Sequence, residues 1–141
     1  MANRNQILTA ANIRYLLALK ELCPENGFTR CVHVAEKLEI SKPSVHAMMN
    51  SLKEMKLIEK DHYGTVRFTE DGFGLATLYE EYFAIIMSSL SDKFSDEKYL
   101  VLAVCAFLAE IPPERLETLR NENENIDISQ AVWVKFQTAM L

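Results

Sequence analysis

The chain has 141 residues, 49% of them hydrophobic, with only four Gly and four Pro. These totals exclude a disordered chain and disfavour a fold of many tight turns, so they predict one domain, or a small domain with a helical extension. The net charge of −5 is unevenly spread: residues 28–67 hold seven Lys or Arg against five acids, or +2, so the rest carries −7. A basic segment on an acidic chain suits nucleic-acid binding through its local field, although scattered surface charge would give the same count.

The three cysteines, Cys23, Cys31 and Cys105, show no paired spacing, so neither a zinc ribbon nor a disulfide framework is expected. The N-terminus lacks the apolar core of a signal peptide. The longest apolar run, residues 99–108, is about half the length that crosses a bilayer. We therefore expect a cytoplasmic protein with reduced thiols and no membrane segment.

The first helix is predicted to begin after Thr9, a candidate N-cap, because leucines and isoleucine follow at helical spacing as far as Leu22. Pro24 and the Asn-Gly pair after it would end this helix. A second, shorter helix is predicted over residues 32–38, where apolar residues again recur at helical spacing.

A new helix start follows after a short turn. Ser41 is the candidate N-cap, and Pro43 lies in the first turn, where its missing N–H costs little. Two strand-like pieces come next, residues 57–60 and 65–68, and Gly64 suits the turn between them. The order of helix, tight turn, helix and hairpin predicts a winged helix-turn-helix, which places one helix in the major groove of DNA with a β-wing beside it.

Residues 69–71 read as the cap of a long fourth helix that extends to Leu90, although Gly72 and Gly74 lower its helix propensity. A fifth helix, over residues 96–110, is apolar nearly all round and therefore predicts a subunit interface.

A sixth helix is predicted to start at residues 112–114, followed by a polar break over residues 121–125 and a last amphipathic helix over residues 128–141. The expected fold class is mainly α: a winged helix-turn-helix DNA-binding domain over residues 1–72, then a helical dimerisation domain over residues 73–141.

The third helix is the candidate recognition helix. We expect its apolar positions to face the core: Val45, Met48, Met49 and Leu52. Ser, Asn and Ala can approach base edges, Lys can reach phosphates, and the helix start lies closest to the groove. The residues predicted to face the DNA are Ser41, Lys42, Pro43, Ser44, His46, Ala47, Asn50 and Lys53, with Tyr63, Thr65 and Arg67 from the wing. The alternative is a solvated polar face on a winged helix that binds a protein.

Other chemistry has little support. His33, His46 and His62 lie in three separate elements, so they indicate phosphate contact or plain surface more than a metal site. Glu80 and Glu81 are adjacent and point in different directions, which favours a solvated face. No phosphate-binding loop, nucleophile elbow, zinc-protease motif or dinucleotide glycine cluster is present, so we expect neither an enzyme nor a cofactor.

Several segments together resemble the N-terminal domain of the diphtheria-toxin-repressor family of iron- and manganese-dependent repressors. The resemblance covers about residues 8–90, and the segments that carry it are Ala35-Glu36-Lys37-Leu38, Ser41-Lys42-Pro43-Ser44-Val45, Leu52-Lys53-Glu54, Leu57-Ile58, Tyr63-Gly64, Phe68-Thr69 and Gly72. It implies a homodimeric, manganese-type short member that binds a palindromic operator. It also implies that Ser41, Pro43, Ser44 and Ala47 approach bases, while Arg30, Lys53 and the wing approach phosphates.

The metal site of that family does not carry over. Its first-helix ligand positions fall on Arg14 and Leu17, its histidine falls on Phe83, and its later ligand motif falls on residues 105–109, where only Cys105 is a possible ligand. One thiolate beside an Arg and apolar groups cannot hold Mn²⁺ or Fe²⁺, which need several oxygen or nitrogen donors. Burying an unpaired charge is costly. Apolar residues in place of the family's charged ligands would therefore stabilise a dimer that holds no metal.

The resulting hypothesis is a homodimeric, sequence-specific transcriptional regulator, a repressor that is not activated by metal at the family position. The fourth and fifth helices either enclose an apolar cavity for an organic effector or pack solid. Two alternatives stay open: a winged-helix module that binds a protein, and a metal-dependent repressor whose site has moved to Cys or His with Glu80 or Glu81.

Overall fold

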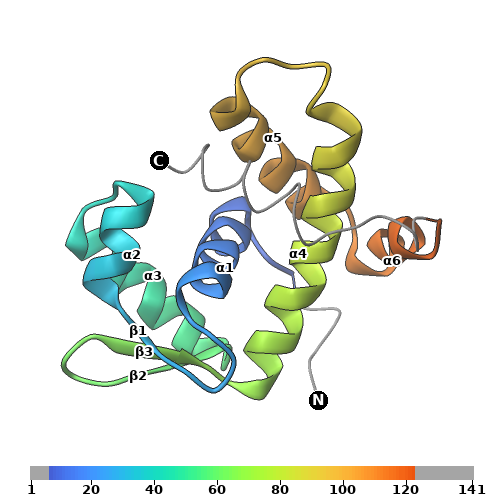
Figure 1. The fold of residues 1–141 in the computed structure, drawn as a ribbon. Helices are drawn as coiled ribbons and strands as arrows, with labels where there is room; N and C mark the ends of the chain where they lie inside the picture. The colour runs from blue at the N-terminus through green and yellow to red at the C-terminus, as the bar shows by residue number, and fades with distance from the viewer. Residues whose placement is uncertain (1–6, 123–141) are drawn as a thin grey trace. The chain divides into compact units, whose positions relative to one another are not determined.

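The computed structural model describes residues 7–122; the predicted helix over residues 128–141 lies outside that range. The fold is mainly helical with one small antiparallel sheet, and the predicted winged helix-turn-helix is confirmed (Figure 1). The elements in chain order are α1 (Ala10–Leu22), β1 (Thr29–Arg30), α2 (Cys31–Leu38), α3 (Lys42–Glu54), β2 (Ile58–Lys60), β3 (Thr65–Phe68), α4 (Glu70–Leu90), α5 (Glu97–Glu110) and α6 (Pro113–Glu122).

The described residues divide into two compact units. Residues 15–77 form the first, and residues 7–14 with 78–122 belong to the second. Both α1 and α4 run through the division, so each unit receives one part of each helix.

The helix-turn-helix of the first unit is made by a change of backbone conformation after α2. Glu39, with φ of 53°, is left-handed and ends α2, and Ser41 then caps α3 from extended backbone. The side chain of Ser41 accepts a hydrogen bond from the N–H of Ser44 at 3.4 Å. The apolar faces of both helices turn inward: Val34, Ala35, Leu38, Val45, Met49 and Leu52 are all buried. Met48, which we expected inside, is half-buried.

The sheet has the strand order β1-β3-β2, and each pair is antiparallel. Side chains alternate as a half-buried sheet requires: Thr29, Ile58 and Val66 are buried, while Arg67 and its cross-strand partner Glu59 are exposed. The β2–β3 hairpin is the predicted wing. Strand β1 was not predicted, because two residues carry no readable alternation and their pairing with β3 makes the strand.

The start of α4 confirms the predicted cap. The Thr69 hydroxyl accepts a hydrogen bond from the N–H of Gly72 at 3.0 Å and donates to the carbonyl of Lys56 at 2.7 Å. The side chain of Thr69 therefore fixes the first turn of α4 to the residues that precede β2.

The second unit begins with the capped start of α1. Thr9 and Asn12 cap each other: the N–H of each donates to the other's side-chain oxygen at 3.0 Å. Asp96 caps α5 by accepting from the N–H of Tyr99. Among the described residues, no helix is both long enough and apolar enough to span a membrane.

Candidate nucleic-acid interface

The outer face of α3 is mostly polar and exposed. The structure places every residue predicted to face DNA from this helix and its cap on the surface: Ser41, Lys42, Pro43, Ser44, His46, Ala47, Asn50 and Lys53 are all exposed. Lys42 and Lys53 lie towards the two ends of this face. Such a face suits contact with base edges flanked by phosphates.

The beginning of α3 is held by two serines. Besides capping the helix, the Ser41 hydroxyl lies 2.9 Å from the Ser44 hydroxyl. Each hydroxyl retains accepting capacity and solvent exposure. Both serines can therefore cap the helix and still contact a ligand.

The wing turn is organised by Asp61. Its Oδ1 accepts hydrogen bonds from the N–H groups of Tyr63 and Thr65, each at 2.9 Å. Because the charged carboxylate receives these bonds, led by the one from Thr65, the pKa of Asp61 is lowered from 3.8. Gly64, with φ of 81°, supplies the left-handed residue that completes the turn.

This turn presents Tyr63 to solvent, with 82% of its surface exposed. Two contacts fix the turn to the helix-turn-helix: the guanidinium of Arg30 donates to the Tyr63 carbonyl at 3.4 Å, and the N–H of Cys31 donates to the Gly64 carbonyl at 2.8 Å. A β-carbon built at Gly64 would lie 3.8 Å from His46 Cε1, so the wing turn and the start of α3 are close together.

A second contact joins the wing to α3 further along the helix. The Lys60 ammonium on β2 donates to Asn50 Oδ1 at 3.1 Å. In the other direction, the Lys53 ammonium reaches the Lys60 carbonyl at 3.5 Å. The wing and the recognition helix therefore present a single surface.

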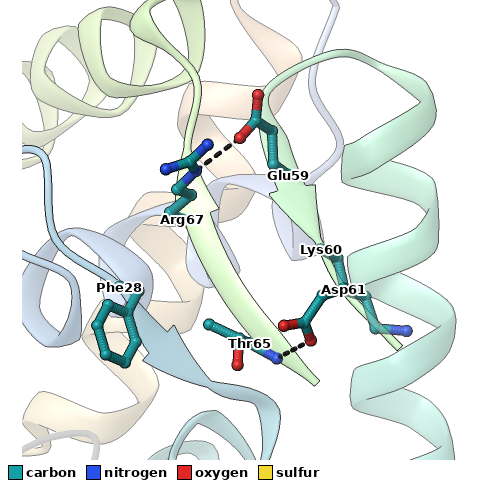
Figure 2. A pocket seen from close by; sticks show the side chains of 6 residues that line it. All are labelled: Phe28, Glu59, Lys60, Asp61, Thr65 and Arg67. Carbon is teal, nitrogen blue, oxygen red and sulfur yellow. Dashed lines mark hydrogen bonds and ion pairs between the residues drawn. The ribbon is translucent and has the colours of Figure 1, made fainter. Parts of the chain in front are cut away.

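The opposite face of the sheet carries a hollow of about 430 Å³ (Figure 2). It is lined by Phe28, Glu59, Lys60, Asp61, Thr65 and Arg67. Arg67 points towards Glu59 across the strands, with Nε 2.6 Å from Glu59 Oε2. Both side chains are more than half exposed, so the pair is weak and the guanidinium can turn to another anion.

The structure therefore brings two groups of predicted residues together. The α3 residues form one exposed surface beside the wing, and Tyr63 is exposed at the wing turn, while Thr65 and Arg67 line the hollow on the other face of the sheet. Sequence reasoning missed two side chains: Lys60, which binds Asn50, and Asp61, which holds the turn. An Asp two residues before a Tyr-Gly turn was a readable signal for the latter.

The positions that correspond to the metal site of the resembled family are apolar or cationic. Leu17, Phe83 and Cys105 are buried, and the Nε of Arg14 is buried with no hydrogen-bond partner in the described part of the chain. Burial raises the pKa of the Cys105 thiol to about 12, and the positive charge of Arg14 opposes that rise only in part. Such a thiol stays protonated at neutral pH, whereas a metal ligand must be a thiolate.

Across residues 7–122, no three His, Cys, Asp or Glu side chains are grouped as a metal site would need. This includes Glu80 and Glu81, the carboxylates of the alternative with a relocated site. A hollow of about 320 Å³ in the second unit is lined by Ile7, Leu8, Tyr79 and residues 109–114.

No protein-family model and no curated protein sequence matches the chain. Its structure is similar to that of the hypothetical protein SSo2273 from Sulfolobus solfataricus, with a TM-score of 0.54 and 23% identity over 82% of this chain and 88% of that chain. A double mutant of ZitR from Lactococcus lactis gives a TM-score of 0.46 and 24% identity over 86% of this chain and 80% of that one. At these identities the first similarity supports the fold alone.

Proposed function

We propose that this protein is a DNA-binding transcriptional regulator, without enzymatic activity, that places α3 in the major groove and the wing turn on the adjacent backbone. One observation carries the proposal: an accessible polar face on α3 is joined by hydrogen bonds to a wing whose turn displays Tyr63. Side chains of Ser, Asn and His beside Lys42 and Lys53 supply both base contacts and phosphate contacts.

The finer features rest on the resemblance to the diphtheria-toxin-repressor family and on particular residues. We propose a repressor that binds a palindromic operator and does not need metal at the family position. The chemistry of that position supports metal independence, because it holds the Arg14 cation and a thiol that burial keeps protonated. Divalent manganese or iron would find neither carboxylate nor imidazole there.

A homodimer is supported by an exposed apolar face on α5. Tyr99 is 72% exposed, Leu102 40% and Phe107 46%, and Ala103 and Ala106 between them are exposed as well. These five residues recur at the spacing of one helix face, whereas the opposite face of α5, including Leu100, Val104 and Leu108, is buried. An apolar stripe of this kind is costly in water and indicates a protein contact.

The α5 face, defined by Tyr99, Leu102, Ala103, Ala106 and Phe107, is complementary to itself in an antiparallel arrangement. A two-fold axis near Ala103 sets small residue against small residue and places Tyr99 of each copy beside Phe107 of the other. The same arrangement brings the exposed Lys98 of one copy towards the exposed Glu110 of the other. A parallel arrangement would oppose like charges, so we propose the antiparallel pair.

The DNA proposal is tested by measuring binding of the purified protein to a labelled fragment of its own promoter at two salt concentrations, with chelator and with added Mn²⁺. We expect binding under chelator that weakens steeply with salt, because phosphate contacts release counterions. Binding that needs Mn²⁺ would contradict metal independence. Salt-insensitive or absent DNA binding would favour the protein-binding module instead.

The dimer is tested by sedimentation of the wild type and of Ala103→Glu, which places a charge at the centre of the α5 face. We expect the variant to sediment as a monomer at concentrations where the wild type is a dimer. Ser89→Glu adds the same charge at an exposed position of α4 and should leave the dimer intact. A dimeric Ala103→Glu protein would exclude this interface.

A further inference from the structure

The contact between Lys60 and Asn50 fixes which atoms Asn50 offers to a ligand. Lys60 is half-buried on β2, and its ammonium lies 3.1 Å from Asn50 Oδ1 on the exposed face of α3. An ammonium only donates hydrogen bonds, so the atom that faces it must be the amide oxygen. The NH₂ group of Asn50 is thereby the end of the amide left for other partners.

Lys60 is held in position by its surroundings. The Lys53 ammonium reaches its carbonyl at 3.5 Å, and Lys60 lies in register opposite Val66 in the antiparallel sheet. Burial raises the pKa of the Cys31 thiol and the nearby charge of Lys60 opposes that rise, so the ammonium lies near Cys31. The ammonium thus sits between the wing and the two helices of the motif, on the helix side of the sheet.

An asparagine reads adenine by a pair of bonds: its oxygen accepts from the adenine N6 amino group while its nitrogen donates to N7. Because the Lys60 ammonium already donates to the oxygen of Asn50, that oxygen is a weaker acceptor, and the positive charge beside it repels the amino group of adenine. The NH₂ group of Asn50 stays available as a donor. Guanine presents acceptors at N7 and O6 and thymine presents one at O4, whereas adenine carries beside its N7 acceptor the N6 amino group that the Lys60 cation repels. The hydrogen bond from a charged donor is stronger than a neutral one, which favours keeping it.

We propose that Lys60 is a specificity-determining residue of the DNA-binding surface: it makes Asn50 a hydrogen-bond donor that selects a guanine or thymine acceptor and rejects adenine. This inference rests on the proposed function, because it assigns a base preference to one position of the recognition helix. Asn50 lies three and four residues after Ala47 and His46, and so on the same exposed face of α3.

The test is selection of bound sequences from random duplex DNA by four proteins: wild type, Asn50→Ala, Lys60→Met and Lys60→Arg. We expect the wild-type site to contain a position that prefers guanine or thymine, and Asn50→Ala to lose that preference. Lys60→Met frees the amide oxygen, so adenine should gain about tenfold or more at the same position. Lys60→Arg keeps a cationic donor and should retain the wild-type preference.

Lys56→Met is the control for the lost charge, since Lys56 is exposed just after α3 and has no side-chain contact with Asn50. It should leave the base preference unchanged, and circular dichroism confirms that each variant is folded. A wild-type preference for adenine at the position that Asn50→Ala alters would overturn the inference, as would an Asn50→Ala protein with an unaltered site. If the wild type binds no duplex at all, the proposed function fails and this inference with it.

Discussion

At the scale of single residues, Asp61 determines the shape of the wing turn. One carboxylate oxygen accepts from two backbone N–H groups, and those groups stabilise the charged form. The aspartate is a turn-forming residue in the ordinary sense, but here its turn also positions Tyr63, a large hydrophobic side chain that is 82% exposed.

A pH dependence follows for Asp61. Its pKa is lowered from 3.8 in the folded protein, so its stabilising contribution is present above that value and is lost as pH falls through the lower folded pKa. Asp61→Asn keeps an accepting oxygen without the titration. We expect the free energy of unfolding, measured with urea between pH 6 and about pH 3, to fall less in Asp61→Asn than in the wild type. Asp92→Asn, at an exposed position of the second unit, should show the wild-type fall.

The thiol of Cys105 makes stability depend on pH in the opposite direction to Asp61. Burial raises its pKa from 9.0 to about 12, so the folded state holds the proton that the unfolded state releases. Its contribution to stability is therefore complete below pH 9.0 and is lost as pH rises towards 12. We expect iodoacetamide at pH 8 to modify Cys105 in urea but not in the native protein, as mass spectrometry of the digested chain would show. Rapid native modification would contradict the buried, protonated thiol.

At the scale of elements, the first turn of α4 lies unusually close to the residue that precedes β2. A β-carbon built at Gly72 would lie 1.7 Å from the Leu57 carbonyl oxygen, which already accepts from the N–H of Thr69 at 3.1 Å. Gly72 is thus required by packing, although the sequence shows only a glycine that weakens a helix.

Gly72→Ala should destabilise the protein by about 3 kcal/mol, the upper range for overpacking, because backbone must move to admit the methyl group. Gly74→Ala is the matched control. Gly74 lies on the exposed side of the same helix, so the substitution should stabilise the protein by about 0.5–1 kcal/mol through helix propensity. Urea unfolding of both variants measures the change in the free energy of unfolding, which should fall for Gly72→Ala and rise for Gly74→Ala. If both substitutions changed the free energy of unfolding equally, Gly72 would not be packed tightly against the Leu57 carbonyl.

Local signals were enough to predict most elements. Ser41 and Pro43 mark the start of α3, Gly64 marks the wing turn, and Thr69 marks the start of α4, because each signal acts within one turn of chain. Strand β1 was not predictable in this way, since it exists through pairing with β3.

In the candidate site too, local sequence predicted some features and only the packing of the fold shows the others. The spacing of Val45, Met49 and Leu52 identified the buried face of α3 and hence its exposed face. The contact of Lys60 with Asn50 joins residues that are ten positions apart, and only the packing of β2 against α3 reveals it. Local sequence therefore predicted which residues face outward but not how their polar atoms are already engaged.

At the scale of the whole molecule, the charge distribution determines how binding responds to salt. The chain carries −5 overall, yet residues 28–67 carry +2, so a polyanion is attracted to one part of an otherwise acidic protein. Only those lysines that lie on phosphates release counterions when DNA binds.

Lys42→Gln and Lys93→Gln separate the local field from the total charge. Both residues are exposed, Lys42 at the start of α3 and Lys93 after the end of α4, and both substitutions change the net charge equally. If Lys42 contacts a phosphate, its loss should reduce the slope of log affinity against log salt by about 0.9. Lys93→Gln should leave that slope unchanged. Equal slopes for both variants, measured by fluorescence anisotropy over a salt series, would mean that total charge governs binding and that α3 does not enter the groove as proposed.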